Sequence, residues 1–184
     1  MKPLRMPRAL HDVLGHEQSA ASLALIGLAM PLAVIAVLPA LLAVEPWRAV
    51  LASLLVADAA AGAVANVTRG TNDYYRASAR RRAAFLAVHV HLPIMALLLD
   101  LPLVPALVAW VLTITAGAII AAFQHRELHK PAAVLAVVVV LSACTLMPDT
   151  TVTLLFITAL FTTKIVLAFA VDHSGTARDG GRHA

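Results

Sequence analysis

The chain has 184 residues, of which 61% are hydrophobic and only 13% charged, with a formal net charge of +4. Soluble domains usually carry about 25% charged residues, so this composition excludes a water-soluble globular protein. The apolar runs are continuous rather than alternating, which excludes a transmembrane β-barrel and predicts an all-α, polytopic integral membrane protein. The basic residues flank the apolar runs, a position that favours a role in membrane topology over nucleic-acid binding.

In chain order, residues 1–18 form a hydrophilic segment in which Leu4–Gln18 is expected to be a short amphipathic helix at the membrane interface. Apolar segments close to the length of a membrane span fill residues 19–173, which we predict to be a transmembrane bundle of six helices. Residues 174–184 are expected to be a disordered cytoplasmic tail. The six predicted spans are Ser19–Val44, Ala49–Val67, Ala83–Leu99, Leu103–Phe123, Ala132–Met147 and Val152–Val171.

Prolines punctuate these spans. Pro31, Pro39 and Pro93 lie inside predicted helices, where a proline removes a backbone donor and introduces a kink. At Pro93 the missing donor frees the carbonyl oxygen of His89 from its usual helical hydrogen bond.

Lysine and arginine residues predict the orientation of the bundle. With six spans and the N-terminus inside, twelve of them fall in cytoplasmic segments and Arg48 alone falls in an outside loop. Such a bias places the basic side in the cytoplasm. The sequence therefore predicts a multi-pass protein of the cell membrane with both termini cytoplasmic.

Ionisable side chains inside a bilayer are costly, so each one in a predicted span is a candidate functional residue. Asp58, Gly62 and Asn66 are four residues apart and share one face of the second span. His89 on the third span and Lys164 on the sixth fall at a similar depth. We predict that Asp58, Asn66, His89 and Lys164 form one polar layer that performs acid–base catalysis. The alternative for Asp58 is a structural role, either a hydrogen bond between helices or an ion pair with Lys164.

The histidines suggest a metal site. His89 and His91 lie two residues apart, which on a continuous helix directs their side chains to nearly opposite sides, and we expect His89 to face the interior. His125 and His129 have a four-residue spacing that lets two imidazoles reach one ion, although a solvated loop is the alternative for them. The predicted metal ligands are Asp58, His89, His125 and His129, with zinc or iron as the ion.

Polar residues at the cytoplasmic ends of the second and third spans are candidates for binding a lipid headgroup. Arg80 and Arg82 are topology determinants first, but arginine also binds anionic groups through paired hydrogen bonds. Asn72 and Asp73 continue the polar face of the second span into the following loop.

Together these residues indicate a small membrane-embedded enzyme that acts on a lipid or another hydrophobic substrate through a polar pocket open to the cytoplasmic leaflet, with or without a metal ion. Two alternatives stay open. One is a proton-coupled carrier of a small molecule or ion, for which a homo-oligomer would supply the second half. The other is a non-catalytic membrane subunit of a larger complex.

Overall fold

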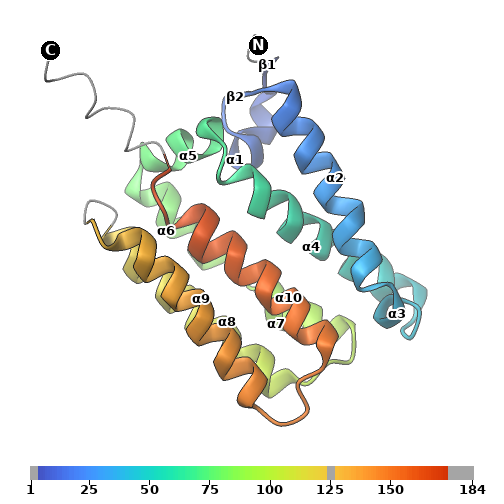
Figure 1. Ribbon diagram of the computed structural model, residues 1–184. Helices are drawn as coiled ribbons and strands as arrows, with labels where there is room; N and C mark the ends of the chain where they lie inside the picture. Colours follow the sequence, from blue (N-terminus) through green and yellow to red (C-terminus); the bar gives the residue numbers. More distant parts are fainter. Residues whose placement is uncertain (1–3, 124–126, 174–184) are drawn as a thin grey trace, which may run out of the picture.

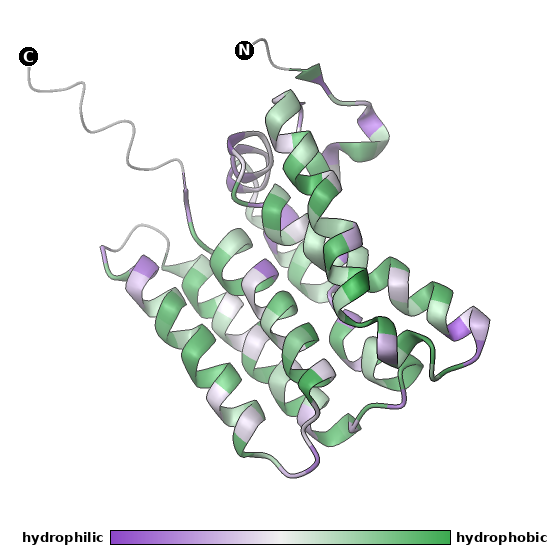
Figure 2. Cartoon of the chain, turned by 45° about the vertical axis from the view of Figure 1, so that its right-hand side comes forward, coloured by the Kyte–Doolittle hydropathy of each residue, from purple (hydrophilic) through white to green (hydrophobic). Residues whose placement is uncertain are grey.

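The computed structural model describes residues 4–123 and 127–173, and it confirms an all-α architecture (Figure 1). Five long apolar helices have the length and composition needed to cross a membrane, as expected for a multi-pass membrane protein. They are α4 (Pro46–Ala65), α6 with α7 (Ala79–Leu98), α8 (Leu103–Ala122), α9 (His129–Leu146) and α10 with its π-helical extension η2 (Val152–Phe169). Hydrophobic residues dominate these helices, and hydrophilic residues gather mainly toward their ends (Figure 2).

The last helix lies at the centre of the bundle. It consists of α10 (Val152–Thr162) and η2 (Thr163–Phe169), and it contacts α4, α8 and α9. Ile157, Phe161 and Ile165 are fully buried along it. Thr162 is hydrogen-bonded to Thr113 of α8 at 3.0 Å, which satisfies both hydroxyls inside an otherwise apolar core.

The first predicted span is not one helix. It divides into α2 (Ala20–Ala36) and α3 (Leu38–Leu41), and α2 is shorter than the five long helices. The break at Val37 lies two residues before Pro39, as expected because proline disfavours helical backbone before it. Helix α2 continues through Pro31, so the kink expected there does not end the helix. That α2 is a sixth membrane span, and therefore that both termini are cytoplasmic, stays a prediction.

The third span is also broken. Helix α6 (Ala79–Val88) ends before His89, and α7 (His91–Leu98) begins two residues later. Pro93 sits in the first turn of α7, where its missing donor is tolerated. The carbonyl oxygen of His89, which Pro93 leaves free, accepts a hydrogen bond of 2.8 Å from the indole nitrogen of Trp110 on α8. A side chain from the neighbouring helix thus stabilises the break.

The N-terminal segment does not form the single helix expected over Leu4–Gln18. Strand β1 (Leu4–Arg5) pairs antiparallel with β2 (Glu17–Gln18), and η1 (Arg8–Leu10) and α1 (His11–Leu14) lie between them. Gly15 ends α1 with a φ of 68°, a left-handed backbone that glycine adopts readily. The turn that follows brings the chain back instead of extending the helix.

This N-terminal segment docks on the start of α5 (Arg69–Arg76) and on the turn before it. A Cβ atom at Gly15 would lie 2.2 Å from the carbonyl oxygen of Gly70, and one at Gly70 would lie 2.0 Å from that of Glu17. Buried Gln18 donates hydrogen bonds to the Leu14 carbonyl at 2.6 Å and to Thr68 Oγ1 at 2.7 Å. Backbone therefore packs directly on backbone at this contact.

Gly70→Ala is expected to displace the N-terminal segment while leaving the helices folded, because the new methyl group meets backbone that cannot move aside. Trypsin should then cut after Arg5 and Arg8 at least tenfold faster in detergent-purified protein. Gly27→Ala is the matched control: its Cβ meets nothing within 4 Å, and alanine favours the helix by about 1 kcal/mol. Equal cleavage of wild type and Gly70→Ala would contradict the docking.

The opposite end of the bundle is held by Arg48, and we call it the Arg48 end. Its guanidinium lies 3.0 Å from Glu45 Oε2, 2.5 Å from Asp100 Oδ1 and 2.6 Å from the Leu97 carbonyl oxygen. The hydrogen bond from Arg48 holds the pKa of Asp100 below its usual value. The lone basic residue expected on the outer side is therefore neutralised by two carboxylates.

Candidate functional site

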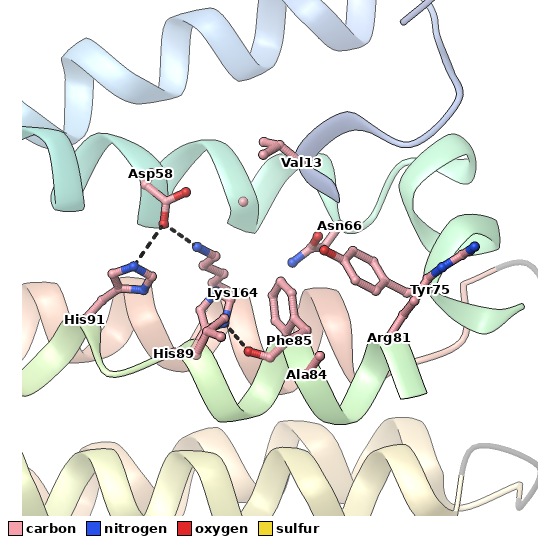
Figure 3. Close-up of a pocket in the computed structure, with 12 residues that line it drawn as sticks. Val13, Asp58, Asn66, Tyr75, Arg81, Ala84, Phe85, His89, His91 and Lys164 are labelled. Atoms are coloured by element: carbon pink, nitrogen blue, oxygen red, sulfur yellow. Dashed lines mark hydrogen bonds and ion pairs between the residues drawn. The ribbon is translucent and has the colours of Figure 1, made fainter. Parts of the chain in front are cut away.

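A cavity of about 340 Å³ lies between α4, the broken helix α6–α7 and η2. Figure 3 shows its polar side chains converging from three directions: Asp58 from α4, the two histidines from the α6–α7 break, and Lys164 from the last helix. Val13 of α1 and Val88 of α6 line it as well, so its wall includes apolar as well as polar side chains.

Asp58 and Lys164 form an ion pair within this cavity. Lys164 Nζ lies 2.5 Å from Asp58 Oδ2. The lysine side chain is only 4% exposed, whereas that of Asp58 is 40% exposed toward the cavity. Gly62 makes room for the lysine, because a Cβ there would lie 2.4 Å from Lys164 Cε. The ion pair expected as the alternative role of Asp58 is thus present, and the carboxylate still faces open space.

The ring of His89 is oriented by its own helix. Its Nδ1 lies 2.5 Å from the carbonyl oxygen of Phe85, an acceptor, so Nδ1 must carry the hydrogen. The ring also packs against Phe85 with the centroids 3.8 Å apart. Nε2 is buried and has no hydrogen-bond partner, and in the neutral ring it presents a lone pair. This is how a histidine is commonly prepared to bind a metal, since the backbone carbonyl fixes the tautomer.

His91 joins the site, contrary to the expectation that it points away from His89. The expectation assumed a continuous helix, and the break between α6 and α7 removes that constraint. His91 Nε2 lies 4.0 Å from Asp58 Oδ2, and the rings of His89 and His91 are 5.0 Å apart. Ligand atoms of Asp58, His89 and His91 all lie within 4.8 Å of one another, so this group can hold a metal ion.

The remaining predicted residues divide into two groups. Lys164 and Asn66 line the cavity with Asp58 and His89, as predicted, and Asn66 is 4% exposed. The other candidates lie elsewhere. Arg82 and Asn72 line a separate small cavity with Asp172, and Asp73 is paired with Arg69 and Arg76. Arg80 is exposed on α6, His129 begins α9 beside an apolar cavity, and His125 lies outside the described residues.

Arg81, between the two arginines chosen from the sequence, is the one that lines the main cavity. Its guanidinium carbon lies 4.3 Å above the Tyr74 ring, and Nη1 donates to the Tyr74 carbonyl oxygen at 3.2 Å. Arg81 belongs to the arginine cluster considered from the sequence, whereas His91 and Trp110 were not predicted at the site. The available signal for them was Pro93, which frees the His89 carbonyl so that it needs a donor from another helix.

No family model matches the chain, and no curated protein or solved structure shows significant similarity to it. The chemistry open to the site follows from its donor set. Two imidazoles and one carboxylate are ligands for zinc or iron(II), and three protein ligands leave a coordination position open, as in catalytic centres.

Proposed function

We propose that this protein is a membrane-embedded, metal-dependent enzyme acting on a lipid or another hydrophobic substrate, with zinc or iron held by Asp58, His89 and His91. The observation that carries the proposal is the convergence of these three ligands in a cavity that is lined by both polar and apolar residues. When bound, such an ion supplies a Lewis acid and an activated water molecule.

The ligand geometry supports the proposal. Atoms bonded to zinc at about 2.0–2.1 Å lie roughly 3.4 Å from one another, so the three side chains need only rotate inward slightly from their present spacing. His89 Nε2 is buried without a partner, and such a group is costly unless a ligand or a water molecule satisfies it. Asp58 Oδ2, which lies 4.0 Å from His91 Nε2, is also hydrogen-bonded to Lys164, and outer hydrogen bonds to a ligating carboxylate are usual.

The rim of the cavity supports a hydrophobic substrate. Val13 and Val88 line the cavity, and Val88 is 63% exposed. In a bilayer this surface faces acyl chains, so a substrate with a polar head and an apolar tail can enter sideways. The positive-inside bias places the α5 end in the cytoplasm, and the proposed site then opens toward the cytoplasmic leaflet.

A proton-coupled carrier is the second candidate, and the buried ion pair between Asp58 and Lys164 is the observation in its favour. A carrier also needs a polar path to the other side of the membrane. Beyond the site, toward the Arg48 end, the buried residues of α4 and α7 are apolar: Ala52, Val56, Leu92 and Met95. The apolar walls of α4 and α7 on that side favour the enzyme.

Metal content tests the proposal. Full-length protein purified in mild detergent without a histidine tag is expected to contain close to one zinc or iron ion per chain by elemental analysis. His89→Ala, His91→Ala and Asp58→Asn should each lower the bound metal at least tenfold, because each removes one of three ligands. His129→Ala is the matched control and should keep the metal, since His129 lies beside a different cavity.

The outcomes separate the candidate sites. Folded wild-type protein that takes up no zinc or iron, even when supplied with it, would contradict the metal-dependent enzyme. Metal lost in His129→Ala but kept in His91→Ala would instead favour the ligand set predicted from sequence spacing, which includes His129 and lacks His91. Circular dichroism of every variant shows whether the helices are intact.

A further inference from the structure

Two buried groups that line the cavity have donor hydrogens for which the described residues supply no acceptor. Asn66 Nδ2 is buried without a hydrogen-bond partner. Lys164 Nζ carries three hydrogens and makes one hydrogen bond, to Asp58 Oδ2. A buried donor left without an acceptor is costly, so these groups are expected to meet a ligand or water molecule in the cavity.

Both donors line the same cavity as the metal ligands. Asp58, Gly62 and Asn66 are four residues apart on one face of α4, so Asp58 and Asn66 are about 12 Å apart along the helix. Lys164 lies between them, because its Nζ would be 3.1 Å from a Cβ at Gly62. Figure 3 shows the Asn66 amide nitrogen pointing into the cavity. The cavity thus has acceptors at the Asp58 end and the Asn66 amide at the other end, with the Lys164 ammonium between them.

The charge of the loaded site favours an anion. Asp58 and Lys164 cancel, His89 is neutral in the arrangement described, and a divalent ion then leaves an excess of two positive charges inside the bundle. Charge buried in a membrane protein is costly unless it is paired. Arg81 adds a further positive charge at the cavity wall.

We infer that the Asn66 end of the cavity binds an anionic oxygen group, phosphate or carboxylate, of an amphiphilic substrate, with Asn66 Nδ2 and Lys164 Nζ as donors. This inference rests on the proposed function and names its substrate class. The anionic group lies about one helical turn from the metal ligands, and the apolar tail of the substrate extends past Val13 and Val88 toward the bilayer.

Calorimetric titration of the detergent-purified full chain tests the inference, with and without bound zinc. The probes are dioctanoylphosphatidic acid, dioctanoylglycerol, octanoate and inorganic phosphate. The phosphatidic acid is expected to bind at least tenfold more tightly than dioctanoylglycerol, which has the same chains without the phosphate. Zinc should increase this preference. Octanoate compares carboxylate with phosphate, and inorganic phosphate binding as tightly as the lipid would assign the site to the free ion.

Asn66→Leu and Asn66→Asp are expected to remove the preference for the anionic lipid while leaving metal content and the affinity for dioctanoylglycerol unchanged. The aspartate variant keeps the size of the side chain, so it stays informative if the leucine variant misfolds. Thr158→Val, which alters a buried polar residue of α10, is the control and should keep the preference.

Equal affinity of the wild-type protein for the neutral and anionic probes would overturn the inference, as would a preference that survives in both Asn66 variants. Metal content is measured on the same samples. Zinc bound without an anion preference overturns this inference alone, whereas an absence of zinc binding contradicts the proposed function.

Discussion

Pro93→Ala is expected to weaken metal binding at the site at least a hundredfold while leaving the protein folded. Alanine restores the backbone donor that can bond the carbonyl oxygen of His89, so α6 and α7 can join into one helix. On a continuous helix His89 and His91 point about 160–200° apart, and only one of them can then reach Asp58. Alanine also favours helix over proline by about 3 kcal/mol, so a loss of folding is not expected.

The measurement is a zinc titration against a competing chelator, with circular dichroism as the check on folding. Pro31→Ala is the matched control, since Pro31 lies inside α2 and its helix already continues through it. Because Trp110 also holds the break, Pro93→Ala/Trp110→Phe removes both constraints. Unchanged zinc affinity in the double variant would show that the break does not position the histidines.

The sequence alone was enough to predict most of the helical framework. Long apolar runs need helices in a bilayer, and the predicted second, fourth, fifth and sixth spans each overlap a long helix of the structure. The four-residue spacing of Asp58, Gly62 and Asn66 also placed one wall of the cavity correctly, because α4 is regular over that stretch. Regular helices make such spacing arguments reliable.

The errors fall where regular geometry stops. His91 was assigned to the wrong side because the break at residues 89–90 depends on Trp110, which lies on another helix. From Pro93 the sequence shows that the His89 carbonyl loses its usual helical donor. It does not show that Trp110 supplies the replacement. The N-terminal helix failed for a similar reason: Gly15 turns the chain back, and its contact with Gly70 joins segments far apart in the sequence. Tertiary contacts of this kind leave little local signal.

Lys164→Met is expected to bind zinc at least tenfold more tightly than the wild type and to be less stable without it. The Lys164 ammonium lies 2.5 Å from Asp58 Oδ2, so an ion bound to this carboxylate lies close to a like charge. Two unit charges 4 Å apart interact by about 4 kcal/mol at an effective dielectric constant of about 20. Methionine keeps the length of the side chain against Gly62 and removes that repulsion.

The stability change follows from the same pair. Without the lysine, the carboxylate of Asp58 loses its partner, and breaking a fully buried pair costs about 3–5 kcal/mol. Because the Asp58 side chain is 40% exposed, we expect Lys164→Met to lower the free energy of unfolding by a smaller amount, about 1–3 kcal/mol. Thermal unfolding with and without zinc measures both effects, and zinc should raise the melting temperature of Lys164→Met more than that of the wild type.

Lys130→Met is the control, because Lys130 is exposed at the start of α9 and its loss should change neither quantity. Weaker zinc binding by Lys164→Met would contradict the expected repulsion and would make Lys164 a positioning residue that holds Asp58 toward the ion. Either result bears on the anion site, since Lys164 faces both Asp58 and the Asn66 end. The repulsion between Lys164 and the metal ion is offset when an anionic substrate group binds beside the lysine. Metal and substrate are therefore expected to bind this cavity cooperatively.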